Sequence, residues 1–490
     1  MLLGLDLGSA GARAVAIDET GAVLASAFLG YPTHSPRPGW VEQDPEAWWR
    51  AAAHVLAGVA AQVRGEIGGL GLTGQHGGVF VDTAGAPVRP AILGSDRRAA
   101  SQAERISERI GARRLIEISG GPALPGCEAP AILWLRDVEP VQFRHTRRVL
   151  LPKDHVRLML TGEAATDVVD AAATLLLDLR RRSWSDEILD ALEIPVAWMP
   201  QVHESLEIAG GLRPSLAAEL GLPAGLPVAA GAGETAAAAV STGIVASGLI
   251  GSSIDSGGLL FAPINDAVAD PGGRLRTACD PVPQRYHLTG TTPSAGASLR
   301  WWRDILGRRF GYEELCAQAD AVAVGADSLF FVPHANGEGT PLHDAGARGA
   351  FVGLRAHHTQ ADLTRAVMEG VVFSLRDRLD VMRALGIEPR QVRATGGGAR
   401  SRLWRQMQAD IFAVPVAAMA STPNPAVGAA LLAGVATGVF SDVAAASATV
   451  ARLESVLEPD PARAARYDQL YRTFSALDPA IRHPAAPRAT

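Results

Sequence analysis

The sequence predicts an α/β protein built from two similarly constructed domains that face one another. The chain has 490 residues, of which 48% are hydrophobic and 20% charged, so each half can bury a core of its own. Each half also begins with an apolar run, a glycine-rich turn and a second apolar run, which is typical of a β-hairpin. A Gly/Ser/Ala stretch at Ser241–Ser247 suits a boundary, and we predict domains at 1–244 and 245–490.

The first half opens with three predicted strands and a helix. Leu2–Leu5 and Ala14–Ile17 are apolar runs that flank a turn with two glycines, and Val23–Phe28 continues the pattern as a third strand. Asp44 is a suitable N-cap because a proline, favoured at the first helical position, and then a glutamate follow it. Ala47–Val63 shows the apolar spacing of a helix.

The second half contains two further glycine turns next to predicted strands. The turn Asp255–Gly258 lies between apolar runs at Gly248–Ile254 and Leu259–Pro263. The second turn, Gly396–Gly398, follows a strand-like run that ends at Thr395 and precedes a helix-like segment, Ser401–Ile411. This repetition of strand, turn and strand supports the prediction of two domains of similar construction.

Composition excludes several classes of function. The formal net charge of -6 gives no basic surplus for nucleic-acid binding. Lys153 is the only lysine, so a phosphate loop with a Gly-Lys-Ser/Thr motif is excluded. Cys127, Cys279 and Cys316 are far apart, which argues against a disulfide framework or a cysteine-ligated zinc site. Because Asp6 interrupts the N-terminal apolar run, we expect no signal peptide and a cytoplasmic location.

Four other segments have simple structural interpretations. Ile411–Ser441 has no charge, but its three prolines favour a buried strand, a turn and a buried helix over a membrane span. Gly69–Gly74 matches the glycine pattern of dinucleotide-binding proteins, but an isolated match of this kind is weak evidence. A strand that leads to Gln75 explains the segment better. We interpret Arg180–Arg182 as a solvated helix end, and His357-His358 as a surface pair that does not share a metal.

Motifs spread over nearly the whole chain identify a family. Gly349–Leu354, a seven-residue gap and Asp362–Glu369 fit the C-terminal signature of the FGGY carbohydrate kinases at every restricted position. Matching stretches include Gly39–Pro45, Arg89–Leu93, Leu151–His155, Asp170–Asp178 and Gly396–Gln406. The chain therefore resembles this family and is most similar to its xylulokinases. The resemblance implies two ribonuclease-H-like domains of the actin-like ATPase class, with the active site in the cleft between them.

The resemblance also implies an ATP- and Mg²⁺-dependent transfer of phosphate to a sugar. The N-terminal domain would bind the sugar and the C-terminal domain the nucleotide. The substrate would be a ketopentose such as xylulose, or a related ketose or polyol, and the enzyme could form a homodimer. No nucleic-acid or membrane partner is implied.

The first glycine turn is the expected phosphate-binding loop. A glycine turn presents several backbone N–H groups in one direction and so forms a nest for an anion. The family match assigns phosphate binding to Gly8, Ser9, Ala10, Gly11 and Arg13, although the hydroxyl usual at the position of Ala10 is lost. Asp6 would hold Mg²⁺, in part through water.

A single carboxylate is the expected general base. Glu234 stands where the family has its catalytic aspartate, and Thr235 stands where an asparagine follows it. A carboxylate there would accept the proton of the sugar hydroxyl as phosphate is transferred. The extra methylene of glutamate implies either a shifted substrate pocket or weak activity, because placement in such sites matters at the ångström scale.

The remaining ATP contacts are expected from the second domain. Ser256 and Gly257 fall where the family contacts the β- and γ-phosphates, but the neighbouring Asp255 adds a negative charge. Gly296, Gly397 and Gly398 fall where the family contacts the nucleoside, since the absence of a side chain permits close approach.

The sugar pocket departs most from the family pattern. Gln75, His76, Gly77 and Asp96 remain as expected sugar ligands, with the histidine one place early. Ala131 replaces a lysine, and Gly339 stands where an arginine is usual. These departures, with Glu234 and Asp255, leave two hypotheses: a working sugar kinase, or a weak or inactive relative that binds a sugar or nucleotide.

Overall fold

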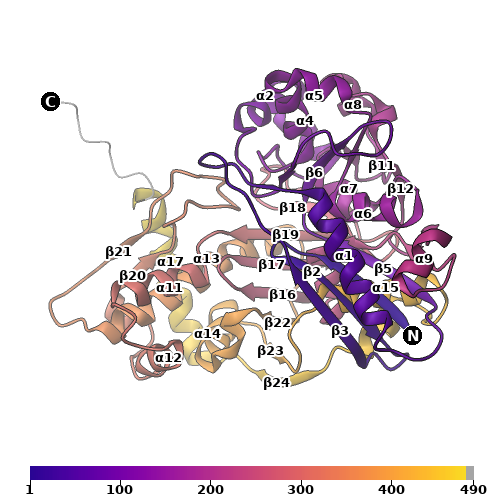
Figure 1. Cartoon of the computed structure of the whole chain (residues 1–490). Helices are drawn as coiled ribbons and strands as arrows, with labels where there is room; N and C mark the ends of the chain where they lie inside the picture. Colours follow the sequence, from indigo (N-terminus) through magenta and orange to yellow (C-terminus); the bar gives the residue numbers. More distant parts are fainter. Residues whose placement is uncertain (482–490) are drawn as a thin grey trace.

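The computed structural model describes residues 1–481 and contains two lobes, each built around a seven-stranded mixed sheet (Figure 1). In the N-terminal lobe the strand order is β13-β14-β5-β1-β2-β3, with β15 paired to β5. β1, β2 and β3 are antiparallel neighbours, whereas β5 runs parallel to β1. The strands are β1 (Leu2–Leu7), β2 (Gly11–Ile17), β3 (Val23–Gly30), β5 (Gly69–Gly74), β13 (Ile208–Gly211), β14 (Pro227–Ala229) and β15 (Ala232–Gly233).

The C-terminal lobe repeats this arrangement. Its sheet has the order β18-β19-β17-β16-β22-β23-β24, in which β16 and β17 form an antiparallel hairpin and β22 runs parallel to β16. The strands are β16 (Leu249–Ile254), β17 (Gly258–Ile264), β18 (Arg276–Cys279), β19 (Tyr286–Thr292), β22 (Gln391–Thr395), β23 (Val416–Met419) and β24 (Leu453–Leu457). Three antiparallel strands beside parallel ones in both lobes confirm the predicted pair of ribonuclease-H-like domains.

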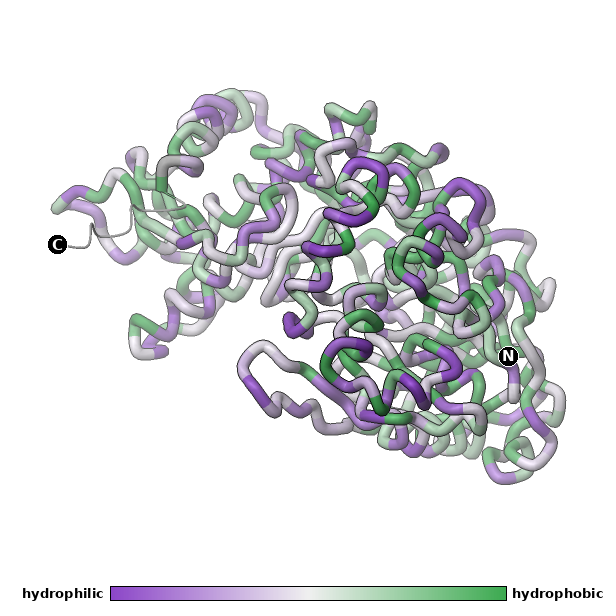
Figure 2. The backbone as a smooth tube through the Cα atoms, turned by 90° about the horizontal axis from the view of Figure 1, so that it is seen from above, coloured by the Kyte–Doolittle hydropathy of each residue, from purple (hydrophilic) through white to green (hydrophobic). Residues whose placement is uncertain are grey.

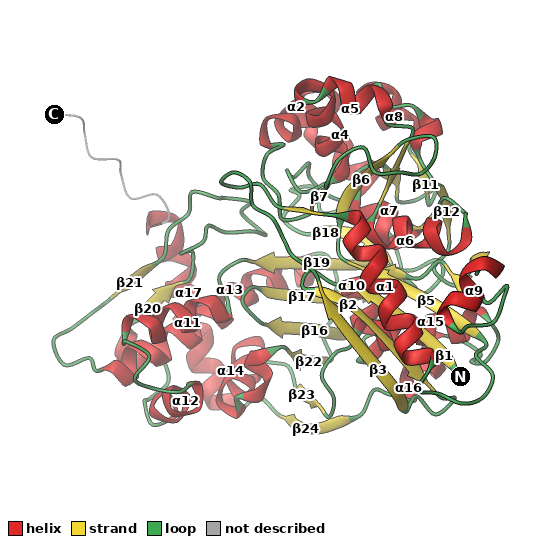
Figure 3. Ribbon diagram, viewed as in Figure 1, coloured by secondary structure: helices red, strands yellow, loops and turns green. Residues whose placement is uncertain are grey.

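Helices cover both sheets (Figure 3). In the N-terminal lobe, α1 (Pro45–Ala60) packs on β2 and β3, and α15 (Pro425–Ala436) packs on β1 and β5. In the C-terminal lobe, the long helix α13 (Gln360–Ala384) contacts β17 and β19. Around α13 lie α11 (Gly296–Ile305), α12 (Tyr312–Asp320), α14 (Arg402–Phe412) and α17 (Pro461–Ile481), together with the two-stranded sheet of β20 (Phe330–Val332) and β21 (Ala350–Val352).

A helical module extends the N-terminal lobe, at the top of Figure 1. It contains the four-stranded sheet β4 (Glu42–Gln43), β7 (Ala91–Leu93), β6 (Gly77–Val81) and β8 (Arg148–Leu150), and the short pairs β9 (Ala165–Asp167) with β12 (Gln201–His203) and β10 (Leu177–Asp178) with β11 (Ser183–Trp184). Its helices include α2 (Ala100–Ile110), α3 (Ala112–Ser119), α4 (Glu128–Val138), α5 (Pro140–His145), α6 (Pro152–Thr161), α7 (Val168–Ala173) and α8 (Asp186–Leu192).

Helix α15 comes from the second half of the sequence but packs on the sheet of the first. The approach is close because glycines line the contact: a Cβ at Gly4 would lie 1.8 Å from the carbonyl oxygen of Ala426, and one at Gly71 would lie 1.9 Å from that of Ala429. The predicted buried strand and alanine-rich helix between Ile411 and Ser441 are thus confirmed as β23 and α15. By sequence, α15 belongs to the predicted domain 245–490, but it packs on the sheet of the other lobe. The two domain ranges stay a prediction.

Most local predictions agree with the structure, but one is wrong. Asp44 caps α1, since its carboxylate accepts a hydrogen bond from Glu46 N at 3.0 Å. Gly69–Gly74 is strand β5, as expected. Arg180–Arg182, however, is not a helix end: it forms the turn between β10 and β11, where Arg182 is buried and pairs with Glu204 at 2.6 Å. The long-range partner Glu204 could not be inferred from a run of three arginines.

None of the helices described here is long and apolar enough to cross a membrane. Figure 2 shows hydrophilic and hydrophobic residues alternating along the backbone tube, as expected for helices and strands that bury one face.

Candidate active site

A cavity of about 850 Å³ lies between the two lobes. Glu234 and Thr235 line it from the N-terminal lobe, and Asp255, Gly397 and Arg400 line it from the C-terminal lobe. The structure therefore places the predicted base in an open cleft, opposite two of the predicted nucleotide-binding turns.

Asp6 and Glu234 both lie close to Gly8. A Cβ placed at Gly8 would be 3.6 Å from Asp6 Oδ2 and 3.8 Å from Glu234 Oε1, so the two carboxylates share one region of the cleft. Asp6 is the penultimate residue of β1, and Glu234 is the first residue of α10 (Glu234–Ser241), which follows β15 directly. The ends of two neighbouring elements thus bring together acids that are far apart in sequence.

Both acids have a raised pKa. Burial raises the pKa of Asp6 well above its usual value, and the negative charge of Glu234 raises it further, whereas Arg13 lowers it. Burial also raises the pKa of Glu234. Asp6 Oδ1 is buried and has no hydrogen-bond partner among the described residues. A buried carboxylate oxygen of this kind, beside a second acid, fits a hard cation such as Mg²⁺.

The hairpin turn after Asp6 lies next to Glu234, which lines the cleft. Ser9 and Ala10 are exposed at its tip, and Gly8 N donates a hydrogen bond to Gly11 O at 3.1 Å across its base. The guanidinium of Arg13 lies over the ring of Phe28, 5.2 Å from its centroid. Gly11 sits in close packing, because a Cβ there would be 2.5 Å from Leu29 O. This geometry agrees with a phosphate-binding turn.

A second cavity, of about 790 Å³, continues along the C-terminal lobe. Its lining includes four of the predicted nucleotide-binding residues, Ser256, Gly296, Gly397 and Gly398, together with Leu299, Tyr312 and Cys316. The glycines allow tight turns: a Cβ at Gly296 would lie 2.3 Å from Asp255 O. Gly257 packs against β19, since a Cβ placed at this residue would lie 2.7 Å from Thr292 O. The apolar and aromatic lining suits a nucleoside.

Gln75 and Asp96 are held by the protein itself. Gln75 is buried and donates through Nε2 to Gln43 Oε1 at 2.7 Å, and Gln43 in turn donates to Ser9 O at 2.8 Å. Asp96 accepts hydrogen bonds from Val41 N at 2.6 Å and from Arg98 Nη2 at 2.7 Å. These contacts link the predicted sugar loop to the phosphate turn, and binding of sugar by either residue stays a prediction.

His76 lies beside the residue that precedes the candidate base, since a Cβ at Gly233 would be 3.4 Å from His76 Cε1. Its side chain is 41% exposed, and its Nδ1 lies 3.7 Å from Asp170 Oδ1. Although part of the ring is exposed, its Nδ1 is buried. This burial, together with the positive charges of Arg276 and Lys153, lowers the pKa of His76 to about 4. Gly77 begins β6, paired with Leu93 of β7, and its Cβ would lie 2.9 Å from Ile92 O. The backbone at Gly77 is therefore fixed close to a neighbouring strand.

A buried ion cluster below His76 did not emerge from the sequence. The ammonium of Lys153 lies 2.7 Å from Asp154, 2.5 Å from Asp167 and 2.9 Å from Asp170, and all four side chains are fully buried. Asp167 caps α7, and its ion pair with Lys153 also joins α6 to α7. The sequence contained one hint of this cluster: Lys153 is the only lysine in a chain that otherwise uses arginine.

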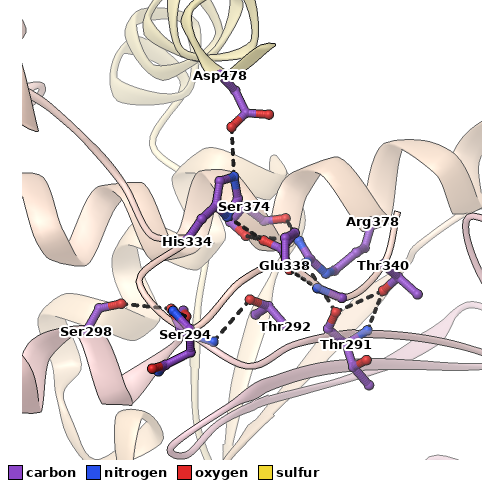
Figure 4. A network of polar contacts seen from close by, with 12 residues as sticks. Thr291, Thr292, Ser294, Ser298, His334, Glu338, Thr340, Ser374, Arg378 and Asp478 are labelled. Carbon is purple, nitrogen blue, oxygen red and sulfur yellow. Dashed lines mark hydrogen bonds and ion pairs between the residues drawn. The ribbon is translucent and has the colours of Figure 1, made fainter. Parts of the chain in front are cut away.

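A second polar network holds the C-terminal lobe together (Figure 4). His334 lies between two acids, with Nδ1 2.9 Å from Glu338 and Nε2 2.7 Å from Asp478 of α17. Glu338 also accepts a hydrogen bond from the buried Arg378 at 2.6 Å. Although burial alone lowers the pKa of His334, its contacts with Asp478 and Glu338 raise it to about 9. The network fixes the loop that contains Gly339.

The prediction of a surface pair at His357 and His358 holds for His357, whose side chain is 61% exposed, but is wrong for His358. The two residues lie in a turn, and the Nε2 atoms of both approach Asp327 Oδ2, at 2.9 and 3.8 Å. His358 is moreover fully buried at its side chain. The three residues do not make a good metal site, because His358 Nδ1 accepts a hydrogen bond from Arg355 N, which leaves the proton on Nε2 in the neutral ring.

Comparison with known proteins shows the family of the chain. The chain matches sequence models described as the FGGY family of carbohydrate kinases, N-terminal domain, over residues 1–241, and C-terminal domain, over residues 253–437. It is 37% identical over 480 residues to the xylulose kinase of Escherichia coli (strain K12), covering 97% of this chain and 98% of that protein. It is 35% identical over 484 residues to the xylulose kinase of Lactococcus lactis, covering 97% and 96%. The crystal structure of xylulose kinase from Rhodospirillum rubrum is similar with a TM-score of 0.93 at 31% identity, covering 98% of each chain.

Proposed function

Because the chain belongs to the FGGY family of carbohydrate kinases, we propose that it phosphorylates a ketopentose, with xylulose as the first candidate, at the expense of ATP. The matches over nearly the whole chain make it an ATP-dependent sugar kinase. The names of its relatives support xylulose as the substrate. The observation that carries the assignment of residues is the position of Glu234, in the cleft beside Asp6 and across from the glycine turns.

Glu234 acts as the general base. Its carboxylate accepts the proton of the attacking sugar hydroxyl while that oxygen bonds to the γ-phosphorus and the bond to the β-phosphate oxygen breaks. Its raised pKa makes it a better proton acceptor than an ordinary glutamate, provided that it is ionised at the working pH. Thr235 lies next to it on the cavity wall and offers a hydroxyl to the sugar.

Two walls hold the triphosphate. The turn from Gly8 to Gly11, with Arg13 nearby, binds phosphate oxygens from the N-terminal side through backbone N–H groups other than that of Gly8, which already donates to Gly11 O. Ser256 and Gly257 do so from the C-terminal side, while Gly296, Gly397 and Gly398 contact the nucleoside. Closure of the lobes brings phosphate and hydroxyl into line and excludes water.

Asp6 holds Mg²⁺, to which its buried and otherwise unpartnered Oδ1 is suited. When bound, the ion neutralises charge on the phosphates during transfer. A homodimer and a cytoplasmic location stay predictions from the sequence.

A coupled ADP-release assay over pentoses, hexoses and polyols tests the proposal. We expect turnover to be stimulated most by a ketopentose. If no sugar stimulates ADP release, while calorimetry still detects binding of sugar or nucleotide, the chain is a binding protein rather than a working kinase.

A further inference from the structure

Several buried polar atoms without partners lie near His76, on the sugar side of the cleft. They are Glu128 Oε1 and Oε2, His76 Nδ1, Asp170 Oδ1 and Arg276 Nε. None of these atoms meets the geometry of a hydrogen bond to another described residue, although the backbone N–H groups of Glu128 and Gly77 lie near the Glu128 carboxyl and lower its pKa. The four residues come from four separate elements: the segment before β6, the start of α4, α7 and β18. We call these residues the Glu128 cluster.

Contacts and charges place the members of the cluster beside one another. Glu128 lies against β6, since a Cβ at Gly78 would be 4.0 Å from Glu128 Cγ. Arg276 reaches across from the C-terminal lobe and donates to Ala172 O at 2.8 Å and to Cys127 Sγ at 3.4 Å, next to Glu128 in the chain. Burial raises the pKa of Glu128 to about 7, Asp170 raises it too, and Arg276 lowers it.

The cluster adjoins the candidate base. A Cβ at Gly233, the residue before Glu234, would lie 2.6 Å from Asp170 Oδ1 and 3.4 Å from His76 Cε1. The side chain of His76 is partly exposed, and its Nδ1 lies close to Asp170. A small molecule whose hydroxyl points at Glu234 would therefore extend its other hydroxyls towards this cluster.

Unpartnered polar groups in a protein interior are costly, and about 1–3 kcal/mol is lost for each buried group left without a hydrogen bond. A ligand that satisfies the buried donors and acceptors of the Glu128 cluster must itself both donate and accept hydrogen bonds. Hydroxyl groups do both, whereas a carboxylate ligand only accepts and would be repelled by two acids.

We propose that the Glu128 cluster is the polar end of the sugar site, and that Glu128 is a specificity-determining residue that favours neutral, hydroxyl-rich substrates over sugar acids. The inference rests on the proposed function for the place of the sugar in the cleft, but not for catalysis. Glu128 accepts hydrogen bonds from the hydroxyls farthest from the reacting one, and Asp170 and Lys153 below it keep the region polar.

The test compares the wild-type chain with Glu128→Gln, which keeps the shape of the side chain but removes its charge. Calorimetry without nucleotide measures binding of xylulose, xylitol and gluconate. We expect Glu128→Gln to lower the affinities for xylulose and xylitol by about 10-fold or more, the usual scale for a hydrogen bond to a charged group. The ratio of the xylulose affinity to the gluconate affinity should also fall. The affinity for ADP should stay within about twofold.

Glu139→Gln is the matched control, because Glu139 ends the same helix and pairs with Arg89 away from the cluster. Xylulose affinity within twofold of wild type in both variants would overturn the inference. If Glu128→Gln does not fold, hydrogen exchange of the wild-type chain decides: xylulose should protect the N-terminal turn of α4, and no protection there contradicts the inference. Sugar binding that depends on Glu128, without ADP release, would overturn the proposed kinase activity and leave this inference standing.

Discussion

Asp255 Oδ1 accepts a hydrogen bond from Gly397 N at 2.9 Å. One backbone N–H of the turn expected to contact the nucleotide is therefore already bonded to a carboxylate of the protein. The other carboxylate oxygen accepts from Ser253 Oγ at 2.9 Å. Asp255 thereby joins the β16–β17 turn to the turn that follows β22. It lines both cavities of the cleft, and a bound triphosphate would meet its negative charge.

Asp255→Asn should strengthen nucleotide binding. Asparagine keeps an oxygen to accept from Gly397 N but removes the charge that repels phosphate. Because Asp255 is exposed and solvent screens its charge, we expect a gain of about tenfold in ATP affinity rather than more. Calorimetry with a non-hydrolysable ATP analogue measures it. Asp266→Asn, an equal change of charge at an exposed loop position, is the control, and a loss of affinity in Asp255→Asn would mean that the carboxylate helps to hold the nucleotide.

Glu234→Gln should lower kcat by about 100-fold or more, while the affinities for sugar and ATP change little, because a positioned base is lost but the shape of the cleft is kept. Steady-state ADP release measures both parameters. Glu234→Asp then shows whether the pocket is adapted to the longer side chain: a further loss means that it is, and a gain means that the present site is compromised. An unchanged kcat in Glu234→Gln would exclude Glu234 as the base.

The pH dependence of kcat should reflect the raised pKa of Glu234. A general base works only when ionised, so kcat falls as the pH drops through the pKa of the base. Since burial raises this pKa, the acid limb should lie above the range of an ordinary glutamate, near 4.3. A profile of kcat measured from pH 4 to 9 at saturating substrates checks this, and a flat profile down to pH 5 would contradict it.

Local signals in the sequence predicted much of the fold and the walls of the cleft. The glycine turns at Gly8–Gly11 and Gly396–Gly398 are visible because they lie between apolar runs, and the N-cap at Asp44 is a property of neighbouring residues. The position of Glu234 beside Asp6 was implied only by the family resemblance. Contacts such as Asp255 with Gly397 depend on two turns about 140 residues apart, and no local pattern predicts them.

Long-range polar groups explain the remaining differences. A run of three arginines predicts a solvated helix end at Arg180–Arg182, but Arg182 is buried because its partner Glu204 lies on another segment. Glu128 stands in the first turn of α4, where a glutamate is ordinarily solvated, and only the tertiary structure buries it among Asp170 and Arg276.

Gly71→Ala should destabilise the protein and loosen the contact between the two halves of the chain. Its Cβ would lie 1.9 Å from Ala429 O, a backbone atom of α15 that cannot move without shifting the helix. We expect a cost of about 3 kcal/mol or more, the upper end for overpacking. Thermal unfolding measures it, with Gly311→Ala as control because a Cβ at Gly311 meets nothing within 4 Å. Equal midpoints in the two variants would show that α15 does not pack against β5 as described.

His334 should make the stability of the C-terminal lobe depend on pH above neutrality. Its pKa is about 9 in the folded chain and about 6.5 when unfolded, so its contribution is fully present below pH 6.5 and is lost as the pH rises through 9. Chemical unfolding at pH 7, 8, 9 and 10 should show the midpoint falling in the wild-type chain. His334→Gln should be less stable at pH 7 and show a smaller fall, because its side chain cannot carry the charge that Glu338 and Asp478 attract. His54→Gln, at an exposed position of α1, is the control and should show the same fall of the midpoint as the wild-type chain. If the midpoint of His334→Gln falls as much as that of the wild-type chain, groups other than His334 cause the pH dependence.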